Sequence, residues 1–414
     1  MKSASHSNKC ATTVVMSSAV LKRAFEFRFY PTAVQAAELA RTFGCVRKVY
    51  NLALEVRTEE WHHHATRIDY YQTSAFLTLW KQTDELAYLN DVSSVPLQQA
   101  LRHLQAAFAA FWERRSEFPR FKSRKRSRDA AEYTRSGFRY QSGELTLAKM
   151  DEPLNIVWSR SLPPGVQPST VTVTRDSAGR WFVSMLCEDP RVQPLPAVCR
   201  SVGIDVGLRH LAVLSTGEKI ANPKHERRDY VRLASAQRAV SRKAPGSRNR
   251  EKARHKAARI YARVADRRRN HLHEVTTRLV RENQTLVIED LTVSNMVRNR
   301  HLARDISDVA WREFREMLAY KASWYGRKLI VIDRWFPSSK LCSSCGLLAE
   351  SMSLEVRAWV CSGCGAAQDR DVNAAKNILA AGRAVTVCGD GVRPQRSTPG
   401  RRSSAKQKAP AREG

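Results

Sequence analysis

The sequence predicts a multidomain α/β protein with a small metal-binding insertion near its carboxyl end. Short apolar strands occur in two separate parts of the chain, and long amphipathic helical patterns lie between them. Four cysteines form a C-x2-C-x15-C-x2-C array, namely Cys342, Cys345, Cys361 and Cys364. With 414 residues, 43% of them hydrophobic, the chain is long enough for about two to four domains, each with its own core.

The first elements are a strand and a helical lobe. Residues 24–29 alternate apolar and charged, which indicates a half-buried strand. Thr32 then fits the N-cap of a helix. Further helical patterns cover about 68–81 and 96–115. In the first helix we expect Val34, Leu39, Phe43, Val46 and Tyr50 to face inward, and in the last Leu97, Leu101, Leu104, Phe108 and Phe111.

A small β-barrel or sheet domain follows the helical lobe. Its predicted strands are short and separated by turn formers such as those at 176–179, and the strand at 24–29 is expected to join them. These strands lie at 145–147, 156–158, 170–174 and 181–187. A linker is predicted from Pro194 to Cys199.

The second half of the chain alternates buried strands with helices. Strands are predicted at 202–205, 211–214, 219–220, 286–289 and 329–332, and helices at 226–243, 248–283, 308–326 and 371–381. Residues 1–20 are read as a disordered extension, with the true start at Met1 or Met16, and the basic tail from Arg393 onward is also expected to be disordered.

The charge of the chain indicates a polyanionic partner. Seventy Lys and Arg against forty Asp and Glu give a formal net charge of +30. A generally basic proteome is the alternative explanation, but the charge is clustered. Residues 114–128 hold eight basic residues and one acid, and residues 224–269 hold seventeen and four. Because solubility needs no such excess on one helical hairpin, we expect contacts with nucleic acid.

The cysteine array predicts a structural zinc site. Four thiolates close a tetrahedron around Zn²⁺ and leave no position for water, and disulfide pairing or simple burial is the alternative. The total of nine cysteines is odd and indicates a reducing compartment. We expect Cys10, Cys45, Cys187, Cys199 and Cys388 to be ordinary thiols. No apolar run is long enough to span a membrane, so a soluble protein is expected.

Three carboxylates stand at the ends or starts of apolar elements. Asp205 and Glu289 each lie at the end of a predicted strand, and Asp371 opens the last helix. Converging acids repel unless cations neutralise them, and a two-Mg²⁺ phosphodiesterase site needs such a cluster. Asp290 and Asp369 are expected to play outer roles. The glycines Gly203 and Gly207 would permit close backbone approach around Asp205.

The Gly-Ile-Asp-x-Gly motif also opens actin-like ATPases. Those proteins share the three-stranded hairpin, but this chain shows no second glycine-rich phosphate loop. Its charge fits a polymer substrate better.

In combination these motifs resemble the TnpB family, the RNA-guided nucleases encoded by IS200/IS605 transposons and related to compact type V CRISPR effectors. The resemblance spans about residues 21–385. It rests on Phe29-Tyr-Pro-Thr32, Phe118-Pro-Arg-Phe-Lys122, Gly203-Ile-Asp-Val-Gly207, Ile288-Glu-Asp-Leu291, Ser307-Asp-Val-Ala-Trp311, Tyr320-Lys-Ala322, Phe336-Pro-Ser-Ser339, the cysteine array and Asp369-Arg-Asp-Val-Asn-Ala-Ala375.

The resemblance implies a domain organisation. A wedge-type β-barrel would comprise 21–31 and 118–195, a helical recognition lobe 32–117, an RNase H-like (RuvC) nuclease domain 196–340 and 366–385, and an inserted zinc knuckle 341–365, with disordered ends at 1–20 and 386–414. The RuvC-type catalytic triad would be Asp205, Glu289 and Asp371. The knuckle would help to load the target strand.

The resemblance also implies nucleic-acid contacts. Tyr70 and Gln98 fall where the family reads the short motif beside a DNA target, although Ser94 and Val95 differ from the basic and aromatic pair of some members. Plain helix-face residues are the alternative. Backbone contacts are expected from Arg120, Lys122, Arg124 and Lys125. Residues 62–64, three consecutive histidines, are expected to form a solvated surface, because neighbours on a helix point in different directions.

The resulting expectation is a Mg²⁺-dependent, RNA-guided DNA endonuclease that uses two metal ions and leaves 5′-phosphates. Its partners would be a guide RNA and a double-stranded DNA target, in the cytoplasm of a prokaryote near the nucleoid, with the protein a monomer. A non-cleaving RNA-guided repressor and a transposase accessory factor for recombination are the other classes. Both a transposon-encoded protein and a small CRISPR effector fit the motifs.

Overall fold

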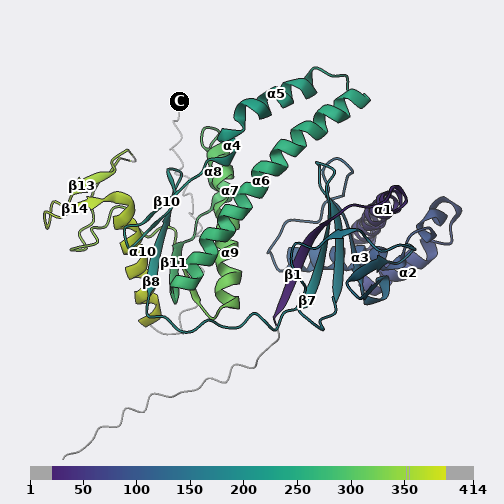
Figure 1. Ribbon diagram of the computed structural model, residues 1–414, viewed down its shortest axis with the longest axis horizontal. Coiled ribbons are helices and arrows are strands. Elements are labelled where there is room, and N and C mark those ends of the chain that lie inside the picture. Colours follow the sequence, from purple (N-terminus) through teal and green to yellow (C-terminus); the bar gives the residue numbers. More distant parts are fainter. Residues whose placement is uncertain (1–20, 351, 354, 388–414) are drawn as a thin grey trace, which may run out of the picture. The chain divides into compact units, whose positions relative to one another are not determined.

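The computed structural model describes residues 21–350, 352–353 and 355–387. Within this range the chain forms two compact units, which are described separately (Figure 1). The first comprises residues 21–194 and 225–271, and the second comprises residues 195–224 and 272–387. The predicted extension at 1–20 and nearly all of the predicted tail, from residue 388, lie outside the described residues.

The first unit contains a five-stranded antiparallel sheet in the order β2-β6-β7-β1-β5. Its strands are β1 (Lys22–Phe29), β2 (Asp129–Thr134), β5 (Ile156–Val157), β6 (Thr170–Arg175) and β7 (Trp181–Glu188). β1 pairs along its whole length with β7, so the strand expected at 24–29 joins the sheet of the later strands. Its alternation places Phe25, Phe27 and Phe29 in the core.

The sheet of the first unit is open. Among the described residues its edge strands β2 and β5 do not pair with each other, and β3 (Phe138–Gln141) and β4 (Glu144–Leu147) form a separate hairpin. The structure therefore shows a sheet where the sequence allowed a barrel or a sheet, and the closed wedge-type barrel of the family resemblance is not found. β2 and β3 were not expected from the sequence.

Helices cover this sheet and share its core. They are α1 (Ala33–His64), α2 (Tyr70–Trp80), the 3₁₀ helix η1 (Asp84–Asn90) and α3 (Ser94–Trp112). The predicted cap is confirmed, because Thr32 and Gln35 form a reciprocal capping box at the start of α1. The inward prediction for Val34 is wrong: it lies in the first turn and is 79% exposed. Phe111 is only half-buried.

The basic stretch of the first unit is a helical hairpin. It consists of α4 (His225–Arg228), α5 (Tyr230–Ser241) and α6 (Arg248–Glu282), whose last residues belong to the second unit. The chain reverses between α5 and α6 at Gly246, where φ is +82°. Figure 1 shows α5 and α6 side by side, and Gln237 Nε2 donates to the Tyr261 hydroxyl at 2.5 Å.

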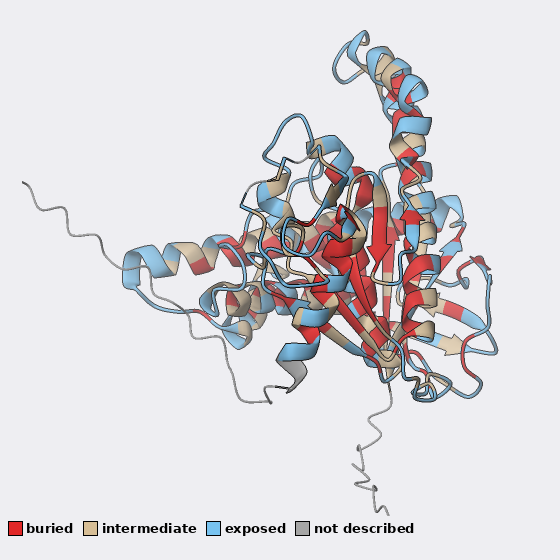
Figure 2. Ribbon diagram, turned by 90° about the vertical axis from the view of Figure 1, so that its left-hand side faces the viewer, coloured by how far each residue is buried: buried red, intermediate tan, exposed pale blue. Residues whose placement is uncertain are grey.

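The second unit contains a mixed sheet in the order β10-β9-β8-β11-β12. The strands are β8 (Ser201–Val206), β9 (His210–Leu214), β10 (Lys219–Ala221), β11 (Thr285–Glu289) and β12 (Lys328–Ile332). β8, β9 and β10 are antiparallel neighbours, whereas β8, β11 and β12 run parallel. Figure 2 shows the strands as mostly buried and the outer helix faces as exposed.

Helices cover both faces of this sheet. On one face Ile204 and Ile288 pack with Leu279 of α6 and Phe314 of α9 (Trp311–Trp324). On the other face lies α10 (Arg370–Val387). A Cβ added to Gly203 would lie 2.0 Å from the Ala375 carbonyl oxygen, so α10 crosses β8 with its backbone against the strand. A Cβ added to Gly207 would come no closer than 3.4 Å, to the His210 carbonyl oxygen, so the expectation of close approach holds only for Gly203.

Two further departures concern the segments around α9 and the cysteine array. The helix predicted at 308–326 is divided at Ala310, whose φ is +55°, into α8 (Ala303–Val309) and α9, and the short α7 (Val293–Met296) precedes it. The segment from β12 to α10 carries the short strands β13 (Ala358–Val360) and β14 (Ala367–Asp369). It contains all four cysteines of the array.

Candidate active site and metal centre

Asp205 and Glu289 lie next to each other at the carboxyl ends of two neighbouring parallel strands. β8 and β11 are in register up to the pair Ile204 and Ile288, so the next residue of each strand is one of these acids. Since side chains alternate along a strand, both acids share the face of Gly203, which α10 covers. Strand pairing alone thus brings two of the three predicted carboxylates together.

The third carboxylate reaches this place through α10. Asp371 is in the first turn of α10, one helical turn before Ala375, which packs on Gly203. Burial raises the pKa of Asp205 well above its usual value, and the charges of Glu289 and Asp371 raise it further. The charges of both other acids therefore act on Asp205.

Two of these carboxylates accept hydrogen bonds from neighbouring side chains. Ser338 Oγ donates to Glu289 Oε1 at 2.5 Å, and Arg357 Nη1 donates to Asp371 Oδ1 at 3.3 Å. Burial raises the pKa of Glu289, an effect that the Ser338 hydrogen bond opposes. Hard carboxylate oxygens are the ligands that suit Mg²⁺, and a cation here would relieve the repulsion that raises the pKa of Asp205.

The two neighbouring acids are held by cations of the chain itself. Asp290 is paired with Arg315 and Arg334, which keep its pKa below the usual value although burial raises it. Asp369 is paired with Lys219 at 2.6 Å and accepts hydrogen bonds from the first amides of α10. Both acids therefore have structural partners, in agreement with the outer roles expected for them.

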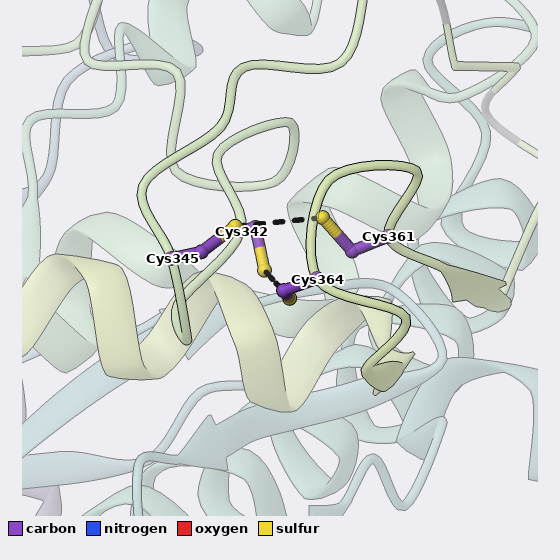
Figure 3. Close-up of side chains that lie close together, drawn as sticks. All are labelled: Cys342, Cys345, Cys361 and Cys364. Atoms are coloured by element: carbon purple, nitrogen blue, oxygen red, sulfur yellow. Dashed lines mark hydrogen bonds between the residues drawn. The ribbon is translucent and has the colours of Figure 1, made fainter.

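The four cysteines of the array meet at one point (Figure 3). Their sulfur atoms all lie within 4.8 Å of one another, with Cys342 and Cys364 separated by 3.8 Å and Cys345 and Cys361 by 3.6 Å. A tetrahedral zinc site with Zn–S bonds of about 2.3 Å requires sulfur separations of about 3.8 Å. Within the residues that the structure describes, this is the only cluster of three or more ligand-type side chains at such distances.

Two equivalent turns build the cysteine cluster. The Gly346 amide donates to the Cys342 carbonyl and the Gly365 amide to the Cys361 carbonyl, both at 2.9 Å. Both glycines have a positive φ, of +77° and +69°, which a residue with a Cβ rarely adopts. Each C-x2-C-G segment therefore folds as a compact unit that presents two sulfurs. The other cysteines that the structure describes, Cys45, Cys187 and Cys199, form no disulfide.

Sequence reasoning missed the residues that join the two sites. Asn377 Nδ2 donates to the carbonyls of Ser338 and Leu341 at 2.8 and 2.6 Å, and Asn373 Nδ2 donates to Leu341 at 2.7 Å. The Ser343 amide donates back to Asn373 Oδ1 at 2.8 Å. These buried amides fasten the loop that carries Ser338 and the first cysteines to α10. Two asparagines four residues apart on an otherwise apolar helix face were the available signal.

The predicted motif-reading pair is in contact in the first unit. The Tyr70 hydroxyl donates to Gln98 Oε1 at 2.7 Å, and the Arg102 guanidinium lies 4.8 Å from the centre of the Tyr70 ring. Ser94 accepts a hydrogen bond from Lys81 Nζ at 2.7 Å. The facing surfaces of α2 and α3 thus combine an aromatic ring, an amide and two cations.

The other predicted contact residues differ in exposure. Arg124 and Lys125 are exposed, as is Arg120, which pairs with Glu117. Lys122 is different: its Nζ lies 3.8 Å from the centre of the Tyr50 ring, and burial lowers its pKa. Lys122 therefore braces the segment against α1. The three histidines at 62–64 are exposed, as expected.

Comparisons with known proteins identify the family of this chain. Residues 183–300 match the family model OrfB_IS605, described as "Probable transposase", and residues 311–378 match the "Cas12f1-like, TNB domain". A protein of Streptomyces pristinaespiralis named "Putative RNA-guided DNA endonuclease" is 65% identical over 94% of this chain and 96% of its own length. The chain belongs to the TnpB family.

A further relative and a solved structure are also similar to this chain. The Escherichia coli K12 protein named "Putative RNA-guided DNA endonuclease InsQ" is 33% identical over 90% of this chain and 96% of its own. The protein chain of a Cas12f1–sgRNA–target DNA complex shares the fold, with a TM-score of 0.54 at 14% identity over 87% of this chain and 98% of that one.

A third family model describes a helix-turn-helix domain and matches residues 16–66. In the described part of that range this TnpB family member has instead a strand, β1, followed by the single 32-residue helix α1. No helix among the described residues has the length and apolarity that crossing a membrane would require.

Proposed function

We propose that this protein is an RNA-guided DNA endonuclease whose active site is formed by Asp205, Glu289 and Asp371. The observation that carries the proposal is that Asp205 and Glu289 follow the last paired residues of two neighbouring parallel strands, in a member of the TnpB family, while α10 brings Asp371 to the same face of the sheet. Phosphodiester hydrolysis by two metal ions uses this donor set.

The topology of the second unit supports an RNase H-like (RuvC) domain. Three antiparallel strands precede two parallel ones, and the acids come from the first strand, the fourth strand and a helix against the same face. We assign residues 196–340 and 366–385 to this domain and 341–365 to the inserted knuckle. In the first unit we assign 32–117 to a recognition lobe and 21–31 with 118–195 to a wedge-type domain.

The three acids would hold two Mg²⁺ ions. When bound there, Mg²⁺ would acidify a water molecule and neutralise charge on the leaving oxygen, and cleavage would leave a 5′-phosphate. The protein residues act by position: Ser338 fixes the rotamer of Glu289, and the contact of Gly203 with α10 sets the distance of Asp371 from β8. Burial of Asp205 makes its ionised form depend on a nearby cation.

The four cysteines would hold a structural zinc ion. Four sulfur ligands close the coordination sphere, so no water could be activated there. The hydrogen bonds of Asn373 and Asn377 connect the loop that begins the knuckle to the helix that carries Asp371. This connection supports a role of the knuckle in presenting a DNA strand to the carboxylates.

The basic surfaces would bind the guide RNA and the paired target. The α5–α6 hairpin and residues 114–128 carry dense positive charge that fits backbone phosphates, while base pairing with the guide supplies sequence specificity. Arg120, Arg124 and Lys125 are free of buried packing, and Tyr70 with Gln98 would read the motif beside the target. We propose a cytoplasmic, prokaryotic protein that acts as a monomer at the nucleoid.

Replacement of the acids tests the function. Asp205→Ala, Glu289→Ala and Asp371→Ala should each abolish cleavage of a guide-matched duplex in Mg²⁺ while the protein still retains its RNA. Asp84→Ala, at an exposed acid of the first unit, is the matched control and should cleave normally. Sequencing of the RNA that co-purifies with the protein should yield one defined guide-bearing species. A triad variant that still cuts would refute the assignment.

The description of the matching family as a transposase favours one second candidate, an accessory factor in recombination. Strand transfer measured with a labelled transposon end separates the two functions, because a nuclease would cut without joining ends. A non-cleaving RNA-guided repressor is disfavoured, since all three acids are present in the sequence.

A further inference from the structure

Trp335 is the most exposed large hydrophobic side chain among the described residues, with 84% of its surface accessible. It lies in the second unit directly after β12. The other exposed large hydrophobic side chains of that unit are aliphatic, namely Val297, Leu302, Val331, Leu347, Leu348 and Val360. Within the described part of the chain the Trp335 ring makes no stacking or cation–ring contact. An unpartnered aromatic ring in this position calls for a physical explanation.

The loop that carries Trp335, residues 333–338, is fastened at both ends to the acidic end of β11. The Asp290 amide donates to the carbonyl of Ile332, the last residue of β12, at 3.1 Å. Arg334 is paired with the Asp290 side chain, and Ser338 donates to Glu289. Trp335 is therefore held by its own neighbours beside the proposed catalytic carboxylates.

The backbone of this loop is fixed while the indole stays in solvent. Asp333 Oδ1 accepts from the Trp335 amide at 2.7 Å, and the Asp333 carbonyl accepts from the Phe336 amide at 3.2 Å. Phe336 packs into the core with Val287 and Ile378 on the α10 side of the sheet. Because these hydrogen bonds already fix the backbone of the loop, stacking of a base on Trp335 would cost little conformational entropy of the loop.

Resting on the proposed function, we propose that Trp335 is a stacking site for an unpaired nucleobase of the strand to be cut. A phosphate that approaches three carboxylates is repelled until cations are bound, so charge alone cannot hold the strand there. Stacking on an indole face is independent of charge and tolerates any base. Stacking on Trp335 would place the phosphate next to the stacked base at the three proposed catalytic carboxylates. Trp335 would thus be a positioning residue.

The surroundings of the ring favour a nucleobase over a protein partner. The flanking residues Asp333 and Arg334 are charged, and their side chains are bound to the loop itself and to Asp290. One flat ring among charged groups lacks the contiguous apolar area of a protein interface. An unpaired base needs only a face of the ring.

Trp335→Ala tests this inference in the complex of the full chain with its co-purified RNA. A guide-matched duplex is bound in Ca²⁺ and cleavage is started with Mg²⁺ under single-turnover conditions. The rate constant should fall about 5- to 150-fold, the equivalent of one stacked base, with cut positions spread over neighbouring phosphates. RNA content and duplex affinity should stay unchanged. Trp335→Phe should restore most of the rate, and Trp61→Ala, at an exposed tryptophan of the first unit, is the type-matched control.

A direct readout of stacking uses a duplex with 2-aminopurine placed next to the cut position. Its fluorescence should be quenched in the Ca²⁺ complex of the unaltered protein and recover in Trp335→Ala. Equal rates, cut positions and quenching in the variant and the unaltered protein would overturn the inference. Failure of the proposed function would look different, since the unaltered complex would then not cut in Mg²⁺, while the quenching would still report whether Trp335 stacks.

Discussion

The two candidate metal centres of the second unit differ in how they are assembled. The cysteine sulfurs lie within 4.8 Å of one another in the protein alone, with separations that suit a tetrahedral ion. The carboxylates of Asp205, Glu289 and Asp371 form no such close group; the charges of the other two raise the pKa of Asp205, and Glu289 and Asp371 accept hydrogen bonds from Ser338 and Arg357. One site is closed by its own turns, and the other stays open.

The difference follows from charge and from chain distance. Neutral thiols can gather without an electrostatic penalty, and each pair is positioned by a local turn with a glycine at its end. Three carboxylates cannot gather in this way, and they come from a strand pair and a helix that are far apart in sequence. A structural site can therefore be encoded locally, whereas the proposed catalytic site depends on the whole sheet and on a cation.

The largest expected effect is at the closed site. Cys361→Ala should remove one ligand of the proposed zinc ion, so the bound zinc should fall from one per chain to near zero. Zinc binding in small sites contributes about 10–16 kcal/mol, so the knuckle should unfold locally and become sensitive to protease. Elemental analysis and limited proteolysis check this. Cys199→Ala, at an exposed thiol outside the array, should keep full zinc content; zinc retained in Cys361→Ala would contradict the assignment.

The packing of α10 on β8 should be almost as sensitive. Gly203→Ala would place a methyl group 2.0 Å from the Ala375 carbonyl, so the backbone of α10 must shift and carry Asp371 away. We expect a loss of stability of about 1–3 kcal/mol or more and loss of cleavage, with normal zinc content. Gly207→Ala is the matched control because a Cβ added there would meet no atom closer than 3.4 Å. Thermal denaturation and the cleavage assay distinguish the two variants. Equal stability and equal cleavage of both would rule out the close contact between Gly203 and α10.

A smaller effect is expected where Ser338 holds Glu289. Ser338→Ala removes the hydrogen bond that fixes this carboxylate, and loss of such an outer partner lowers activity or metal affinity by about 10–100-fold. Raised Mg²⁺ should recover part of the rate. Ser339→Ala changes the neighbouring hydroxyl and should have little effect. The Mg²⁺ dependence of single-turnover cleavage is the measurement, and an unchanged dependence for Ser338→Ala would argue against its role.

The smallest effect concerns stability in the absence of metal. The folded protein raises the pKa of Asp205, so its ionised form destabilises the fold, and stability falls as pH rises from the ordinary carboxyl range through the raised pKa. Asp205→Asn should therefore raise Tm at neutral pH by about 2–4 °C, a gain that disappears at acidic pH.

The control for this prediction is Asp290→Asn. The pKa of Asp290 is lowered by its arginine partners, so that variant should lose stability at neutral pH. Calorimetry in EDTA across pH measures both variants. A fall in Tm for Asp205→Asn at neutral pH would contradict the raised pKa of Asp205 in the folded protein.

Much of the architecture could be predicted from local sequence. The alternation of 24–29, the cap at Thr32 and the break before Gly246 depend on neighbours in the chain, and they appear where the pattern placed them. The inward orientation predicted for Val34 is wrong because helical spacing does not indicate where along its length a helix first contacts the sheet. β2 and β3 were missed because their polar residues alternate without a strong apolar signal. The helix predicted at 308–326 has a continuous apolar pattern, and only the backbone conformation of Ala310 divides it.

The sequence by itself determined the chemistry available to this protein: a four-cysteine array, three acids at element ends and a strongly basic surface. Tertiary structure decided which groups meet. Parallel register places Asp205 beside Glu289, the missing Cβ of Gly203 admits α10 with Asp371, and the loop bound through Ser338 leaves Trp335 in solvent. These outcomes depend on contacts between distant segments, whose geometry is set by packing and hydrogen bonding and not by residue spacing.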